Sequence, residues 1–121
     1  MSEMRLGAVE SRFADIVWLH EPLPSGELAK ICLEELSWKR TTTYTVLKKL
    51  CDRGIFQNVN GTVSAVISRE KFYAMQSDEY VKENFSGSLP AFIAAFTSGK
   101  KLSDGEIDEI QRMIDRAREG K

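Results

Sequence analysis

The hydrophobic pattern of this chain changes its period at Gly54, from the spacing of helices to the alternation of strands. Before Gly54, three amphipathic segments repeat apolar residues every three or four positions, over about 6–20, 25–37 and 40–53. After it, two short alternating segments flank Asn60-Gly61, a pair that favours a tight hairpin because both residues tolerate positive φ. Three helices followed directly by a hairpin predict a winged helix-turn-helix.

Residues that start or stop helices support these boundaries. Pro22 and Pro24 end the first helical pattern, because proline lacks the amide hydrogen that a continuing helix requires. Ser25 is expected to be the N-cap of the second helix, whereas Lys39 is a poor cap for the third. Gly54 suits the left-handed position that closes the third helix.

Positive charge is concentrated in one short segment, although the 121-residue chain has a net charge of only −1. Residues 37–54 carry five basic side chains and one acidic one, a net of +4. Residues 1–36 carry three basic and seven acidic side chains (net −4), and residues 55–121 carry nine and ten (net −1). A basic stripe on a nearly neutral protein is typical of a nucleic-acid-binding surface. From charge alone, an ordinary solvated helix face is an equal alternative.

The third helical segment separates an apolar face from a polar one. Successive residues lie 100° apart on a helix, which turns Tyr44, Leu47, Leu50 and Cys51 inward. Thr42, Thr45, Val46, Lys49 and Arg53 lie on the opposite face. Threonine offers a hydroxyl and a methyl group to base edges, while lysine and arginine bind phosphates. This segment is therefore predicted to be a DNA recognition helix. The residues expected to contact DNA are Lys39, Arg40, Thr41, Thr42, Thr45, Val46, Lys48, Lys49 and Arg53, with Asn60 from the hairpin.

The second half of the chain returns to helical spacing. A helical pattern from Arg69 to Phe85 is broken by Ser86-Gly87-Ser88, and a short apolar helix follows. Ser103 and Glu106 form a capping box at the start of a final helix. The predicted fold class is mainly α, with a winged-helix DNA-binding domain over 1–68 and a small helical dimerisation domain over 69–121.

Apolar stripes in this second half are too long for its short helices to bury alone. We therefore expect two copies of the chain to pair there, which would set two recognition helices over a pseudo-palindromic operator. The residues expected at the dimer contact are Phe72, Tyr80, Leu89, Phe92, Ile93, Phe96, Ile107, Ile110 and Ile114.

Other function classes find little support in the sequence. Cys32 and Cys51 fall at apolar positions without a CxxC pair, and His20 is the one histidine, so neither a metal site nor a cofactor is expected. No set of side chains suited to catalysis is apparent, and an enzyme is the least expected class. The N-terminus lacks the pattern of a secretion signal and no apolar run is long enough to span a membrane, so a cytoplasmic protein is expected. A winged helix that binds a protein partner is one alternative to this DNA-binding regulator, and a repressor of a different regulon with another signal is the other.

Two motifs resemble the penicillinase-repressor (BlaI/MecI/CopY) family of bacterial regulators. One runs from Trp38 through the threonines and Leu47-x-x-Leu50 to Arg53-Gly54. The other combines the segment 85–89 with the segment 102–107. The resemblance covers about residues 6–117, and it implies a homodimeric repressor with N-terminal winged helices and a C-terminal dimerisation segment.

The resemblance also implies how repression would be relieved. In members that respond to β-lactams, a membrane sensor-protease signals exposure and the repressor is cut within the short helix, at a bond that matches Ala95-Phe96. The resistance-protein repressors carry asparagine at the position of Ala95, and Phe96 is in any case expected to be a core residue of the dimer. Copper sensing is not expected, because this chain has no cysteine after Cys51.

Overall fold

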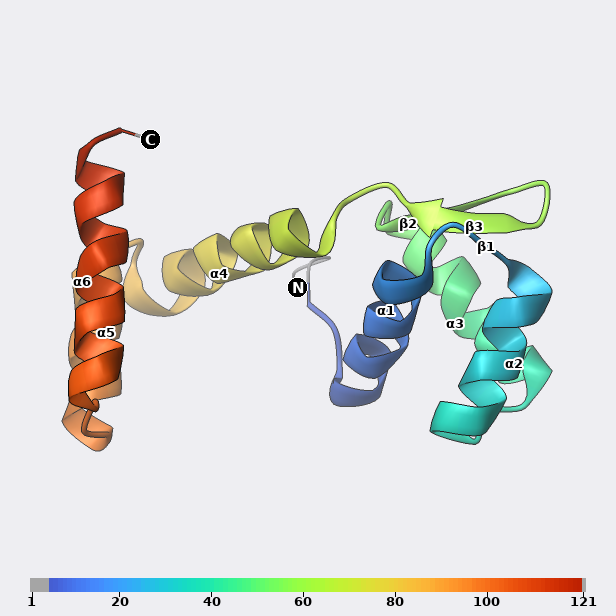
Figure 1. The fold of residues 1–121 in the computed structure, drawn as a ribbon, viewed down its shortest axis with the longest axis horizontal. Coiled ribbons are helices and arrows are strands. Elements are labelled where there is room, and N and C mark those ends of the chain that lie inside the picture. The colour runs from blue at the N-terminus through green and yellow to red at the C-terminus, as the bar shows by residue number, and fades with distance from the viewer. Residues whose placement is uncertain (1–4, 121) are drawn as a thin grey trace. The chain divides into compact units, whose positions relative to one another are not determined.

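The structure is a computed structural model, and it describes residues 5–120. It is mainly helical with one small antiparallel sheet, which confirms the predicted fold class (Figure 1). The elements are α1 (Ala8–His20), β1 (Leu23–Pro24), α2 (Ser25–Leu36), α3 (Arg40–Asp52), β2 (Phe56–Val59), β3 (Thr62–Ala65), α4 (Arg69–Phe85), α5 (Leu89–Gly99) and α6 (Asp104–Arg118).

The chain divides into two compact units, Met1–Glu79 and Tyr80–Lys121. The division falls inside α4, whereas the sequence placed the boundary at 68/69, where that helix begins. The reason lies in the first turns of α4: Phe72 is fully buried, and its ring lies 5.5 Å from that of Trp18 in α1. These turns therefore complete the core of the first unit.

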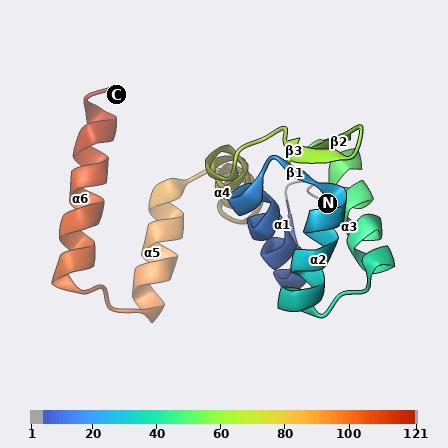
Figure 2. The ribbon, with the colours of Figure 1, turned by 45° about the vertical axis from the view of Figure 1, so that its right-hand side comes forward.

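The first unit packs α1, α2 and α3 against the sheet around one apolar core. Phe13 and Phe56 are both buried in it, and their rings meet edge to face with centroids 6.5 Å apart. Trp38, in the turn between α2 and α3, stacks on Phe13 at 5.6 Å. Buried leucines of α2 and α3 join these aromatic contacts in the core. The two helices lie side by side (Figure 2).

The hairpin forms where it was predicted. Two residues, Asn60 and Gly61, join β2 to β3 with φ of 52° and 85°, and Val59 pairs with Thr62 across the turn. Positive φ at both positions is the condition for a primed turn, which Asn-Gly meets at little cost. The sheet has a third strand that the sequence pattern did not predict, because the two-residue β1 pairs with β3 in the order β1-β3-β2.

Two details of the helices differ from the predictions. The N-cap of α2 is Pro24, and Ser25 is the first helical residue rather than the cap. On α3, Thr43 is fully buried with Leu47 and Leu50, while Tyr44 and Cys51 are only half-buried. The inward face of α3 therefore includes Thr43, one residue before the Tyr44 that the apolar pattern placed there.

Other predicted helix ends are confirmed. Lys39 is the N-cap of α3 without a side-chain hydrogen bond, and Gly54 follows the helix with φ of 81°. At the start of α6, Ser103 Oγ accepts from the Glu106 amide at 3.1 Å, and Glu106 Oε1 accepts from the Ser103 amide at 3.0 Å. This is the reciprocal capping box.

The second unit contains the end of α4 and the helices α5 and α6, which run in opposite directions (Figure 2). A row of aromatic rings joins α4 to α5, with centroids of Phe85 and Phe92 5.5 Å apart and those of Tyr80 and Phe92 6.1 Å apart. Neither α5 nor α6 has a buried residue. Within one chain, the second unit therefore lacks a closed core.

Candidate nucleic-acid interface

The start of α3 presents short polar side chains to solvent. Thr41, Thr42 and Thr45 are exposed, and Val46 beside them is half-buried. Thr45 Oγ1 donates to the carbonyl of Thr41 at 2.9 Å, one turn earlier in the helix. The buried face of α3 fixes the helix on the core, so these side chains are held on a rigid surface that no described part of the first unit covers.

Two cations flank this surface at its N-terminal end. Lys39 and Arg40 are exposed, and the Arg40 guanidinium lies over the ring of Tyr44 at 5.7 Å. Arg40 Nε donates to the Tyr44 hydroxyl at 3.3 Å, and this bond, with a smaller effect from Ser25, lowers the pKa of the Tyr44 phenol. Arg40 also approaches Gly26, so it lies where the first turn of α2 meets the first turn of α3.

Three other cations that were expected to bind phosphate already have partners within the chain. Lys48 Nζ lies 3.2 Å from a carboxylate oxygen of Asp52, in the next turn of α3. Lys49 Nζ lies 2.7 Å from Glu10 Oε2 in α1. Arg53 Nη1 donates to the carbonyl of Arg5 at 3.1 Å. Lys48 and Lys49, toward the end of α3, are therefore paired with carboxylates, whereas no ion pair of Lys39 or Arg40 occurs within residues 5–120.

The hairpin contributes polar but uncharged groups. Asn58, Asn60 and Thr62 are all exposed, and the segment 56–65 contains no lysine or arginine. The carbonyl of Gly61 accepts a hydrogen bond from the Ser25 amide at 2.8 Å, which ties the hairpin tip to the N-terminus of α2. Asn60 thus stands close in the fold to the helix-turn-helix.

Glu10 and Tyr44 belong to this region but were not predicted as site residues. Tyr44 was assigned to the core because its ring is large and apolar, although its hydroxyl reaches the polar edge of α3. The pairing of Glu10 with Lys49 joins residues 39 positions apart in the chain. No local spacing rule identifies such a pair.

The residues expected at the dimer contact have different surroundings. The expectation for Phe72 is corrected. Its side chain is 0% exposed in the core of the first unit, so it has no surface that a second chain could contact. Phe92 is half-buried among the aromatic rings of the second unit. The remaining members are exposed, namely Tyr80, Leu89, Ile93, Phe96, Ile107, Ile110 and Ile114. Ala95, at the expected cleavage bond with Phe96, is exposed on α5.

Comparison with known proteins identifies the family. The sequence profile of the family described as "Penicillinase repressor" matches residues 6–116. The chain belongs to the penicillinase repressor family. The match spans both compact units, so the exposed start of α3 and the open helices α5 and α6 are parts of one penicillinase-repressor architecture.

One curated relative carries the same name. The chain is 20% identical to the "Penicillinase repressor" of Bacillus licheniformis over 115 residues, which cover 92% of this chain and 90% of that protein. Among the residues described, no helix is both long and apolar enough to cross a membrane. Residues 5–120 also hold no group of three or more His, Cys, Asp or Glu side chains arranged to bind a metal ion.

Proposed function

We propose that the chain is a transcriptional repressor that binds double-stranded operator DNA as a homodimer, with α3 as its recognition helix. The observation that supports this most strongly is the threonine-led, cation-flanked start of α3, which is exposed while the opposite face of the helix is buried. A repressor acts where the chromosome is, so the proposal places the protein in the cytoplasm.

Base contacts would come from the first two turns of α3. The hydroxyls and methyl groups of Thr41, Thr42 and Thr45 are short enough for a close approach to base edges in the major groove, with Val46 beside them. Lys39 and Arg40 would bind phosphates on one side of the groove.

The other proposed DNA contacts are weaker or peripheral. Lys48, Lys49 and Arg53 are exposed or half-buried. Carboxylates within the chain neutralise part of the charge of the two lysines, and Arg53 donates to a backbone carbonyl. Asn60 would reach the DNA backbone from the hairpin without adding charge.

Dimerisation is proposed through the second unit. The side chains of Leu89 and Ile114 are 58% and 50% exposed, and neither α5 nor α6 buries a residue within one chain. Many large apolar side chains exposed on two neighbouring helices mark a surface that another surface is expected to cover. A second copy is the simplest cover, because a twofold axis places the same stripe on both sides of the contact.

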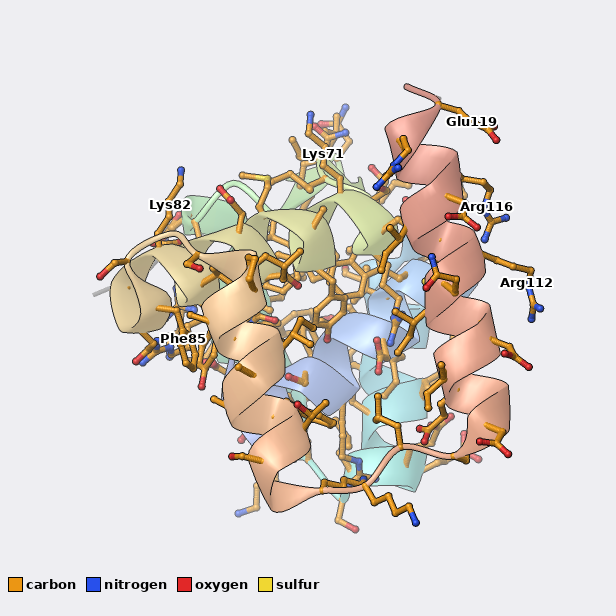
Figure 3. The ribbon with its side chains drawn as sticks, turned by 90° about the vertical axis from the view of Figure 1, so that its left-hand side faces the viewer. Lys71, Lys82, Phe85, Arg112, Arg116 and Glu119 are labelled. Atoms are coloured by element: carbon orange, nitrogen blue, oxygen red, sulfur yellow. The ribbon has the colours of Figure 1, made fainter. Side chains whose placement is uncertain are left out.

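Charge on α6 favours an antiparallel pair of these helices. Acidic side chains occupy the first half of α6 (104, 106, 108 and 109). The second half holds Arg112, Arg116 and Arg118 with one acidic residue, Asp115. Arg112 and Arg116 project from the side of α6 that faces away from α5 (Figure 3). The same distribution suits the dipole of a single helix, so it supports the pairing without requiring it.

Derepression by proteolysis is part of the proposal. A cut at Ala95-Phe96, on the exposed helix α5, would separate α6 from the rest of the second unit and weaken the dimer. A membrane sensor-protease, or a protease downstream of it, would be the partner in this step. The family membership supports this mechanism, and the alanine at position 95 makes the sequence preference of the protease the property to measure.

DNA binding tests the core of the proposal. Fluorescence anisotropy with a random duplex at several salt concentrations should give a binding constant that falls steeply as salt increases, because phosphate contacts release counterions. An Arg40→Ala chain should bind more weakly and with a shallower salt slope. If the chain fails to bind random and promoter duplexes even at low salt, the proposal is wrong and a winged helix that binds a protein partner is favoured.

A further inference from the structure

The carboxylate of Glu10 is fixed in place against the basic end of α3. Its Oε1 accepts from the Gly7 amide at 3.1 Å, at the start of α1, and its Oε2 lies 2.7 Å from Lys49 Nζ. The Glu10 side chain is only 20% exposed, while that of Lys49 is 52% exposed. One end of the ion pair is therefore held by the fold, and the other lies on the surface that is proposed to face DNA.

The Glu10 carboxylate interacts electrostatically with more than one cation. Lys49 and Arg53 both lower the pKa of the Glu10 carboxyl, Lys49 more strongly through its hydrogen bond. Arg53 is itself held nearby, through its hydrogen bond to the Arg5 carbonyl. The charges of two cations that the sequence assigned to phosphate binding therefore favour the ionised form of this one carboxylate.

An ion pair of this kind weakens the attraction of Lys49 for DNA. The pair has no net charge, and a phosphate that approached Lys49 would also approach the carboxylate. Sequence-independent binding depends on the number of phosphates that a protein neutralises, whereas base readout by the threonines does not depend on Lys49. Holding Lys49 in an internal ion pair would therefore weaken sequence-independent binding to phosphates and leave base readout by the threonines unchanged.

We propose that Glu10 is a specificity-determining residue, which limits non-specific DNA binding by holding Lys49 in an internal ion pair. This inference rests on the DNA-binding function proposed above. It predicts that Lys49 stays with Glu10 rather than with phosphate when the repressor scans DNA of unrelated sequence.

The test compares four full-length chains: the parent, Glu10→Gln, Lys49→Gln and the double variant. Glutamine keeps an oxygen for the Gly7 amide but removes the charge, so α1 should remain capped. Asp15→Asn is the matched control, because Asp15 is also an α1 carboxylate in an ion pair, 2.9 Å from Arg69, and lies outside the proposed interface. Thermal unfolding checks that each chain is folded, and anisotropy with a random duplex and with a selected operator gives affinity and salt slope.

Glu10→Gln should bind the random duplex up to roughly fivefold more tightly per protomer at 0.15 M salt, with a salt slope steeper by up to about 0.9 per protomer. The gain should disappear in the double variant, and Asp15→Asn should match the parent. Lys49→Gln alone should leave the slope nearly unchanged.

Two results would overturn the inference while leaving DNA binding itself intact. In the first, the parent binds DNA and a folded Glu10→Gln chain binds the random duplex no more tightly. In the second, the gain persists in the double variant or appears equally in Asp15→Asn, which would show a general effect of net charge. Absence of DNA binding by the parent would instead contradict the proposed function.

Discussion

Thr42 and Thr43 are neighbours in the chain with opposite surroundings. Thr42 is exposed at the start of α3, whereas Thr43 is fully buried and its Oγ1 has no hydrogen-bond partner among the described residues. The buried thiol of Cys32 is the polar group beside it, since Thr43 partly offsets the rise in the Cys32 pKa that burial causes. A thiol is a weak hydrogen-bond partner, so the Thr43 hydroxyl adds little to stability. Because Thr42 is exposed and Thr43 is buried, changes at Thr42 are expected to affect DNA binding and changes at Thr43 to affect stability.

Thr43→Val should stabilise the protein without weakening DNA binding. An unsatisfied buried hydroxyl costs about 1–3 kcal/mol, and valine replaces it with a methyl group while keeping the β-branched shape. We expect the free energy of unfolding in urea to rise by roughly 1 kcal/mol. A fall in stability would mean that the hydroxyl makes a hydrogen bond that stabilises the folded state.

Thr42→Ala should weaken operator binding by about 1 kcal/mol, within the range for a lost base contact, and leave stability and binding to a random duplex unchanged. Affinities for a selected operator and a random duplex, measured at the same salt concentration, check this. An equal loss on both duplexes would assign Thr42 to the DNA backbone rather than to bases.

The sequence predicted this face of α3 well but not its centre. The 100° spacing of helix residues placed Thr42 and Thr45 outward, as found. It placed Tyr44 in the core because of its apolar ring, although Tyr44 is half-buried and Thr43 is fully buried. Burial of a hydroxyl and exposure of a phenol depend on tertiary packing, which residue type alone does not reveal.

At the scale of elements, α1 and α3 are joined by the Glu10–Lys49 ion pair. The hydrogen bond from Lys49, followed by that from the Gly7 amide, holds the pKa of Glu10 below its ordinary value of 4.5. A carboxyl with a lowered pKa in the folded state stabilises the protein above its unfolded pKa. That contribution is lost as the pH falls through the lower, folded value.

Glu10→Gln should therefore flatten the acid side of the stability profile. Urea unfolding of parent and variant is compared at pH 6 and below pH 4. The parent should have a higher free energy of unfolding than the variant at pH 6. This difference should be smaller below pH 4. A difference that does not change with pH would mean that the Glu10 charge is not coupled to folding.

Elements were predicted where a local signal determines them. The Asn60-Gly61 turn and the Ser103–Glu106 capping box depend on residues no more than three positions apart, and both were predicted correctly. Strand β1 was not, because two residues show no alternation and the strand exists through pairing with β3. The division between the compact units lies inside α4 rather than at its start, since the burial of Phe72 depends on contacts with α1 rather than on its own helix.

At the scale of the whole molecule, the second unit is complete only if something covers α5 and α6. Apolar side chains such as Ile110 and Ile114 are exposed on α6, at 38% and 50%. The sequence predicted exposed apolar stripes here, because they are longer than the helices can bury alone. Pairing with a second copy stays a prediction.

Ile110→Glu should convert the dimer to a monomer and greatly reduce operator affinity, because a charged side chain would be buried at the contact. The first unit should keep its fold, since α6 lies in the other unit. Sedimentation equilibrium at micromolar concentration, with circular dichroism, checks both expectations. Met75→Glu, on an exposed position of α4 within the first unit, is a control that should remain dimeric.

The most direct test of a dimeric repressor with α3 in the major groove is selection of bound fragments from random and genomic DNA. We predict enrichment of an inverted repeat whose half-sites have centres separated by a whole number of helical turns, about 10 base pairs or a multiple of it. Enrichment of no common sequence, or of a single half-site without its inverted mate, would contradict this.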